Sequence, residues 1–312
     1  ASFEKGLLDG VVKEYYPTGE LNKEINHPPP KQHGLEKTFH KNGQLRTKIS
    51  YLAGELHGDF HSYYDNGQIQ LETRNEHGNK NGFFKAYNKE GIKIQEGNYK
   101  NGSLDGACFV YFDSGKPKQK VNYTRGKIVD ALHYYPNGKL KEKQNFKNEG
   151  KDRKVKVYFE NGKLKAEQEY KDEKPEGTWK TNFENGNLKE KTVYKTGKLN
   201  GVKQLNYKNG KPKSKIEYFN NKKQGLAKTY HESGKLASEI TYRLNLKQGL
   251  GRTYHKTNNK VASEGLYHRN YKYGKWYYYN QNDVLIRRES YRRGKLIARK
   301  NYTKGKKRKH IK

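Results

Sequence analysis

Apolar and polar side chains alternate along short stretches of this chain, and turn-forming residues separate the stretches. In residues 154–159, the odd positions carry Val, Val and Phe, whereas the even positions carry Lys, Lys and Tyr. A period of two is typical of a β-strand with one packed face and one wet face. No stretch keeps the 3.6-residue period of a helix, so the chain is predicted to be all-β.

The strand-and-turn pattern recurs about every 24 residues. Each copy has two adjacent aromatic positions, then two variable residues and a turn glycine, as in Tyr63-Tyr64-Asp65-Asn66-Gly67. The twelve turn positions are Gly19, Gly43, Gly67, Gly91, Gly115, Gly138, Gly162, Gly186, Gly210, Gly234, Asn258 and Asp283. Asn-Gly between alternating segments predicts a β-hairpin whose two turn residues both have positive φ.

Two further positions complete each repeat. A second glycine stands nine residues before most turn positions, although Val129 and Arg153 replace it in two copies. An aromatic residue stands eight residues after most turn positions, and pairs such as Asn101-Gly102 follow it. Each repeat is therefore predicted to consist of a strand, a first turn, a second strand and a second turn.

Stacking these hairpins predicts an elongated, solenoid-like, single antiparallel meander of about twelve repeats. Two strands per repeat advance the stack by about 10 Å, and each hairpin is supported by its neighbours. We expect one continuous repeat array over residues 1–303 and a basic C-terminal tail over residues 304–312. Pro28-Pro29-Pro30 predicts a stiff loop in the first copy.

The repeat unit resembles the bacterial MORN-variant repeat. The segments that carry the resemblance include 99–106, 134–141 and 194–201, and the similarity extends over about residues 6–303. The resemblance implies a meander of antiparallel hairpins that docks on membrane lipids or on proteins, and bacterial members are often described as antitoxin components. The departures from the pattern are Asn75, Asn182, Asn206, Asn258 and Asp283, and they predict local irregularity in repeats eight, nine, eleven and twelve.

The composition favours a thin packed layer over a conventional core. Only 31% of the residues are hydrophobic, whereas 13% are aromatic. Aromatic side chains bury large areas, so stacked tyrosines can replace aliphatic packing. There is no run of 18 apolar residues, and Cys108 is the one cysteine, which we expect to be a small packing residue.

Basic charge is concentrated towards the C-terminal end. The chain carries a formal net charge of +33, and counting along the sequence places +1 in residues 1–100, +8 in 101–200 and +24 in 201–312. Such a one-sided field attracts polyanions. The candidate anion-binding residues are Arg287, Arg288, Arg292, Arg293, Arg299, Lys306, Lys307, Arg308 and Lys309. The alternatives are solubility, compositional drift and a tail without a specific role.

Residues 24 apart fall on one face, and the first aromatic of each pair forms a stripe. Its candidates are Tyr63, Tyr87, Tyr111, Tyr134, Tyr158, Tyr230, Tyr254 and Tyr279. Packing between adjacent repeats is the favoured interpretation. The alternative is a groove for glycans, peptides or bases, because aromatic rings interleaved with lysine are used in single-strand binding.

Catalytic motifs and spaced metal ligands are absent from the sequence, so neither an enzyme nor a cofactor is expected. His40, His231 and His255 occupy the second aromatic position, which suggests that they substitute for aromatic residues. His57 and His61 are too far apart along one strand to share a metal.

The sequence therefore predicts a non-enzymatic repeat scaffold. Its basic C-terminal third would dock on an anionic partner, with a membrane or envelope surface favoured over nucleic acid, and its repeat face would bind a protein. The alternatives are an antitoxin-like or immunity-like binding module, a self-assembling extracellular structural protein that associates end to end, and a nucleic-acid binder. Because the sequence contains no methionine and starts at Ala1, export is favoured, although a cytoplasmic location stays open.

Overall fold

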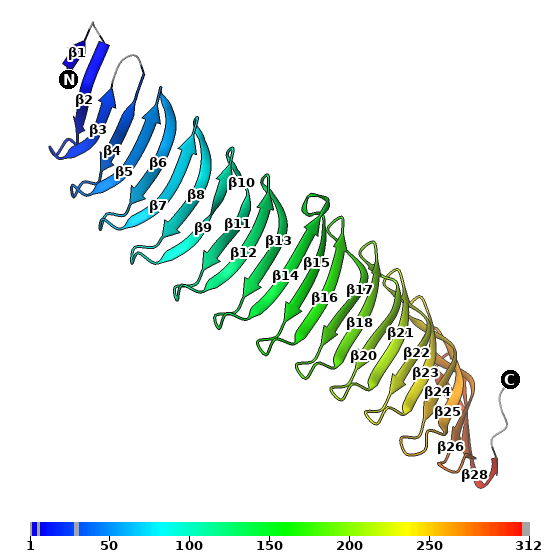
Figure 1. Cartoon of the computed structure of the whole chain (residues 1–312). Coiled ribbons are helices and arrows are strands. Elements are labelled where there is room, and N and C mark those ends of the chain that lie inside the picture. Colours follow the sequence, from blue (N-terminus) through cyan, green and yellow to red (C-terminus); the bar gives the residue numbers. More distant parts are fainter. Residues whose placement is uncertain (1, 5–6, 28–30, 308–312) are drawn as a thin grey trace. The chain divides into compact units, whose positions relative to one another are not determined.

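The computed structural model in Figure 1 describes residues 2–4, 7–27 and 31–307. These residues form 28 β-strands and a single short 3-10 turn. The chain divides into two units, Ala1–Gly150 and Lys151–Lys312, and each is described by itself below. The predicted all-β meander of 24-residue hairpins is confirmed within each unit, whereas a continuous array over residues 1–303 stays a prediction.

Unit 1 is a meander in which each strand, apart from one strand of two residues, pairs antiparallel with the next along the chain (Figure 1). Its elements are β1 (Ser2–Glu4), β2 (Leu7–Tyr15), β3 (Leu21–His27), β4 (Gly34–Phe39), β5 (Leu45–Leu52), β6 (Glu55–Tyr63), β7 (Ile69–Glu76), β8 (Asn79–Tyr87), β9 (Lys93–Lys100), β10 (Ser103–Leu104), β11 (Gly106–Tyr111), β12 (Pro117–Thr124), β13 (Lys127–Tyr134), β14 (Leu140–Lys147) and η1 (Asn148–Gly150). The short β10 and the following β11 both pair with β9.

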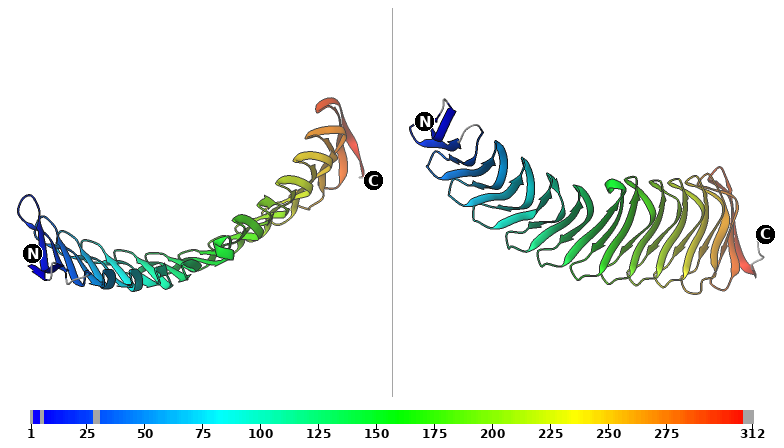
Figure 2. Two further views of the ribbon diagram at one scale, coloured as in Figure 1. Left: turned by 90° about the horizontal axis from the view of Figure 1, so that it is seen from above. Right: turned by 45° about the horizontal axis from the view of Figure 1, so that its top comes forward.

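Unit 2 repeats the same arrangement, and Figure 2 shows in two further views that its strands follow one another in chain order. Its elements are β15 (Asp152–Tyr158), β16 (Leu164–Lys171), β17 (Lys174–Asn182), β18 (Leu188–Lys195), β19 (Lys198–Leu199), β20 (Gly201–Asn206), β21 (Pro212–Phe219), β22 (Lys222–Tyr230), β23 (Leu236–Arg243), β24 (Leu246–Tyr254), β25 (Val261–His268), β26 (Tyr271–Tyr279), β27 (Val284–Arg292) and β28 (Lys295–Lys307). β28 includes residues 304–307 of the predicted tail.

Each sheet has two different faces, because alternate residues of a strand point to opposite sides and cross-strand partners point to the same side. The first, which we call the apolar face, carries the buried small and aromatic side chains: Ile25, Phe84, Cys108, Val121 and Ala131 in unit 1, and Val155, Ala166, Ala227 and Trp276 in unit 2. The opposite side, which we call the charged face, carries rows of cross-strand neighbours such as Lys13, Glu24 and Lys37, or Lys156, Glu167 and Lys180.

The second glycine and the later aromatic of each repeat are cross-strand partners. Gly82 pairs with Tyr99, and Gly225 pairs with Tyr242. The tyrosine rings pack on the apolar face, where the centroid of Tyr99 lies 5.2 Å from that of Phe84. Each layer of this packing is one side chain thick, which explains why few aliphatic residues are sufficient.

The two kinds of turn differ in conformation. In the first turn at Asn66-Gly67, only the glycine has a positive φ, 83°, and its N–H donates to Tyr64 O at 3.0 Å. The prediction of two positive-φ residues is wrong here, because a longer loop uses a type I turn followed by one left-handed residue. The prediction holds at second turns such as Asn101-Gly102, where φ is 49° and 76°.

Local irregularities occur where repeat length changes. Before Val129 the sequence is one residue short, and the pairing of β12 with β13 shifts there by one residue instead of two. This smaller shift, at the place where Val129 replaces the second glycine, accounts for the 23-residue repeat. In repeat eleven the first turn is one residue longer, and Asn259, with φ 60°, takes the place predicted for Asn258. Asp283 occupies its predicted place with φ 66°.

Candidate binding surfaces

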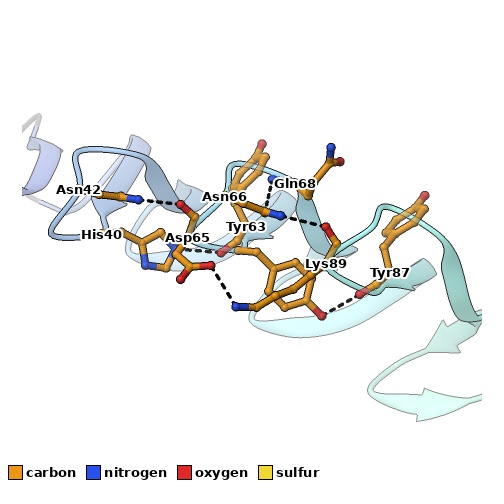
Figure 3. Close-up of polar contacts among 9 residues, drawn as sticks. His40, Asn42, Tyr63, Asp65, Asn66, Gln68, Tyr87 and Lys89 are labelled. Carbon is orange, nitrogen blue, oxygen red and sulfur yellow. Dashed lines mark hydrogen bonds and ion pairs between the residues drawn. The ribbon is translucent and has the colours of Figure 1, made fainter.

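The first turns of successive repeats are joined by hydrogen bonds whose donor and acceptor are 23 residues apart (Figure 3). Asn42 Nδ2 donates to Asp65 O at 2.7 Å, and Asn66 Nδ2 donates to Lys89 O at 2.9 Å. The oxygen of each amide accepts from its own turn, as in the 3.1 Å contact from Gln68 N–H to Asn66 Oδ1. The turn asparagine therefore shapes its own hairpin and connects it to the next one.

The second aromatic of each pair makes a similar contact. Tyr64 OH donates to Tyr87 O at 2.9 Å, and His40 Nε2 lies 3.0 Å from Tyr63 O. His255 Nε2 lies 2.9 Å from Tyr279 O in unit 2. Histidine thus replaces tyrosine because both can place a donor at the far end of a ring. His231 differs, since its Nε2 is buried without a hydrogen-bond partner.

The aromatic stripe also connects neighbouring repeats, through its hydroxyl groups. Tyr87 OH donates to Glu72 at 2.9 Å, Tyr254 OH to Glu239 at 2.6 Å and Tyr279 OH to Glu264 at 3.0 Å, and Tyr111 OH bonds Glu96. Each glutamate lies 15 residues earlier, in the preceding repeat. Burial, reinforced by Glu72, raises the pKa of Tyr87. These contacts hold adjacent repeats together, and a ligand groove along the stripe stays a prediction.

The other stripe candidates occupy the same strand position. Tyr134, Tyr158 and Tyr230 pair with Leu140, Leu164 and Leu236, respectively, beside the first turn. Tyr63 stacks on His61 with ring centroids 6.3 Å apart. In repeats eight and nine the stripe position holds Asn182 and Asn206, which are much shorter than tyrosine.

Two of the candidate anion-binding arginines are bound by a buried carboxylate. Arg299 Nε lies 2.9 Å from Glu289 Oε1, and Arg287 Nε lies 3.4 Å from the same oxygen. Glu289 is 3% exposed on the apolar face of β27. These two arginines therefore already have a carboxylate partner inside the fold.

Tyrosine hydroxyls complete the Glu289 cluster. Tyr278 OH donates to Glu289 Oε2 at 2.6 Å, and Tyr291 OH donates to it at 2.8 Å. Burial alone would raise the pKa of the Glu289 carboxyl, but the hydrogen bonds from the two tyrosines and the nearby arginines lower it overall. Burial and Glu289 together raise the pKa of Tyr278. Nearby, burial lowers the pKa of Lys272, whose amine lies 4.5 Å over the Trp276 ring.

The remaining anion-binding candidates divide into three groups. Arg292 and Arg293 are exposed at the second turn between β27 and β28. Arg288 is half-buried on the charged face, where Lys300 of β28 is its cross-strand neighbour. Lys306 and Lys307 belong to β28, and Arg308 and Lys309 lie outside the described residues. The structure does not bring the seven described candidates together into one site.

A different grouping is present at the last three second turns of unit 2. Each turn exposes an arginine beside a large apolar side chain, and we call this set the basic turn edge. Its members are Arg243, Leu244 and Leu246 at β23–β24, Arg269 and Tyr271 at β25–β26, and Arg292, Arg293, Lys295, Leu296 and Ile297 at β27–β28. Leu244, Tyr271 and Ile297 are 56%, 63% and 62% exposed.

A family model matches the chain in nine segments, each about one repeat long. The model for the MORN repeat variant matches residues 8–27, 32–53, 56–74, 104–124, 130–148, 154–172, 175–196, 199–220 and 223–243, more than half of the chain. The chain belongs to the MORN repeat variant family. MORN hairpins continue outside the matched segments, because β8 with β9 and β24 with β25 keep the same pairing.

Comparisons with whole proteins add little to the MORN assignment. No curated protein matches the chain. Two crystal structures, of TcdB2-TccC3-Cdc42 and TcdB2-TccC3-TEV, are 11% and 12% identical over 94% and 95% of this chain, with TM-scores of 0.18 and 0.15. The MORN chain spans 19% of the length of each of those chains. At these TM-scores neither structure informs the fold or the function.

Two features of the MORN surface escaped the sequence analysis. The glutamates that bind the stripe tyrosines were missed, although their constant distance of 15 residues was visible. The basic turn edge was missed because charge was counted by segment, not by hairpin edge. Over residues 2–4, 7–27 and 31–307, no group of three His, Cys, Asp or Glu residues is placed to hold a metal ion. The same residues contain no helix long and apolar enough to cross a membrane.

Proposed function

We propose that this MORN repeat protein is a binding scaffold that docks on an anionic membrane surface through its basic turn edge. The observation that carries the proposal is the repeated pairing of an exposed arginine with an exposed apolar side chain at three successive second turns. Peripheral membrane binding uses this combination, because basic groups attract anionic headgroups while apolar side chains enter the interface.

The charge distribution around this edge supports the proposal. Only six acidic residues occur in residues 201–312, and none of them lies at these three second turns: Glu217, Glu232, Glu239, Glu264, Asp283 and Glu289. Glu239, Glu264 and Glu289 are engaged with tyrosines and basic side chains within the sheet. Over residues 31–307 none of these exposed turn arginines forms an ion pair with a carboxylate that would offset its charge.

The residues of the basic turn edge can contact one surface together, because neighbouring second turns are bonded to one another. The N–H of Asn270 in the β25–β26 turn donates to Lys247 O in β24 at 3.0 Å, so neighbouring second turns are hydrogen-bonded. Successive hairpins are spaced by about 10 Å, which places several cations within reach of one lipid surface. Each basic residue near an anionic membrane contributes about 1 kcal/mol.

The experiment is co-sedimentation of the full chain with vesicles of phosphatidylcholine, with and without phosphatidylglycerol. A variant with Arg243, Arg269, Arg292 and Arg293 all changed to Gln is expected to bind the anionic vesicles about a thousandfold more weakly. A second variant, Leu244→Ser with Tyr271→Ser, keeps the charge and is expected to lose the salt-resistant part of the binding.

The matched control changes Lys171, Lys174, Lys195 and Lys198 to Gln. These four exposed residues lie at other second turns of the same unit and remove the same charge. The control is expected to weaken binding only a few-fold, through the long-range field. An equal loss in both charge variants would show that net charge, not the basic turn edge, attracts the vesicles. Absence of binding by the unmodified chain would also overturn the proposal.

A further inference from the structure

The charged face of unit 2 carries a second row of cations, separate from the basic turn edge. Lys165, Lys189 and Lys213 each follow the first residue of a second strand, in β16, β18 and β21. The pairings of Leu164 with Tyr158 and of Leu188 with Asn182 show that consecutive hairpins share one register. The three amines therefore occur at equivalent places in three consecutive hairpins.

Each of these lysines is placed over an aromatic ring of the preceding first turn. Lys165 Nζ is 5.6 Å from the Phe159 centroid, Lys189 Nζ is 5.9 Å from that of Phe183, and Lys213 Nζ is 5.7 Å from that of Tyr207. A ring face at this distance attracts the charged ammonium, so it helps to position the side chain.

These lysines differ from those in the middle of the strands on the same face, which lie opposite glutamates. Lys156 and Lys180 pair with Glu167 at 3.4 and 3.8 Å, and Lys228 pairs with Glu239 at 3.1 Å. Within the part of the chain that the structure describes, Lys165, Lys189 and Lys213 form no ion pair. All three are exposed, so their charge is directed at solvent.

The two departures in the aromatic stripe fall between these lysines. Along the charged face the order is Tyr158, Lys165, Asn182, Lys189, Asn206, Lys213 and Tyr230. Asn182 Nδ2 donates to Leu164 O at 3.0 Å, and Asn206 Oδ1 accepts from Gln204 at 2.9 Å, so both amides are fixed against the sheet. Short side chains replace tyrosine rings over this stretch.

We infer that the row from Lys165 to Lys213 binds an extended acidic polysaccharide with one anionic group per disaccharide. The lysines repeat at about 10 Å, the advance of one hairpin. Disaccharides of extended polysaccharides repeat at a similar spacing, whereas the phosphates of one DNA strand follow at about 3.4 Å along the helix axis. The short Asn182 and Asn206 side chains keep the space between the cations clear of the tyrosine rings found at this position in other repeats. This inference does not rest on membrane docking.

The experiment measures binding of hyaluronan oligosaccharides to the full chain by calorimetry at low and physiological salt. Dextran is the neutral control, and polyphosphate of equal charge tests the spacing. Affinity is expected to rise with each added disaccharide until three are present, and polyphosphate is expected to bind more weakly than the matched hyaluronan.

Two variants distinguish the effect of the lysine row on binding from the effect of net charge. Changing Lys165, Lys189 and Lys213 to Gln is expected to weaken hyaluronan binding about thirtyfold, whereas the same change at Lys156, Lys180 and Lys228 is expected to weaken it only a few-fold. Circular dichroism confirms that each variant is folded. Equal losses in the two triple variants would overturn the inference.

A third variant keeps the charge constant. Asn182→Tyr with Asn206→Tyr restores the residue found at this position in other repeats and is expected to block the row, with at least a tenfold loss of hyaluronan affinity. Unchanged affinity would contradict the inference, as would stronger binding to polyphosphate than to hyaluronan. None of these substitutions touches the basic turn edge, so vesicle binding tests the other proposal independently.

Discussion

Replacing Glu289 by Gln tests how much the buried carboxylate stabilises the last hairpins. The substitution keeps the shape but removes the charge that accepts hydrogen bonds from Tyr278 at 2.6 Å, Tyr291 at 2.8 Å and Arg299 at 2.9 Å. A hydrogen bond to a charged group contributes about 1 kcal/mol more than a neutral one. The two tyrosines therefore give a loss of about 2 kcal/mol, and Arg299 adds little because it is half exposed to water.

The assay is amide hydrogen exchange in β26–β28, because repeat arrays open locally. At neutral pH, exchange in Glu289→Gln is expected to be about thirtyfold faster than in the unmodified chain. Glu232→Gln, at an exposed first turn of the same unit, is the matched control, and its exchange is expected to stay within about twofold.

The pH dependence gives a second, independent check. The pKa of Glu289 is lowered by folding, so its contribution is fully present above the ordinary value of 4.5 and is lost as the pH falls through the lowered value. The difference between the two proteins is therefore expected to shrink in acid. A difference of the same size at neutral pH and at about pH 3 would refute an explanation based on the carboxylate charge.

Three further predictions concern the repeats themselves. Tyr64→Phe removes the 2.9 Å contact to the next repeat and is expected to cost about 1 kcal/mol in urea unfolding, whereas Tyr15→Phe, at an exposed ring, should be neutral within error. Glu173→Gly is expected to stabilise unit 2 by about 1 kcal/mol, because Glu173 has a φ of 62°; an unchanged or lower urea midpoint would contradict this. Cys108 is buried, and burial raises the pKa of its thiol, so a thiol reagent should modify it slowly in the native chain and rapidly in urea; equal rates would show that the site is open.

The repeat could be predicted from the sequence alone, because the same local pattern of residues occurs in twelve copies. Alternation predicted the strands, and the constant spacing of aromatic and glycine positions predicted their register. Details that depend on neighbouring hairpins were harder to predict. The conformation at Asn66-Gly67 depends on loop length, and the shift of the turn from Asn258 to Asn259 depends on one inserted residue.

The candidate surfaces were less predictable than the fold. Arg287 and Arg299 looked like free cations, since a sequence does not show that Glu289 is buried between them. Arg292 and Arg293, which were named only as anion-binding candidates, lie at an exposed turn, and their apolar neighbours are recognisable only once the hairpin edge is known. Cross-strand proximity, which links residues far apart along the chain, is the information that composition and local pattern lack.

The bonds between first turns run in one direction. Asn42, Asn66 and Asn185 each donate to a carbonyl 23 residues later, and none of these bonds requires a side chain specific to one copy. Duplication or deletion of one whole repeat of 24 residues therefore keeps this spacing of donor and carbonyl at the new junction, whereas a change by one residue needs a compensating change in a strand bulge or a turn, as at Val129 and Asn259. Unequal recombination within the coding sequence can thus lengthen or shorten such an array in single steps that keep it foldable.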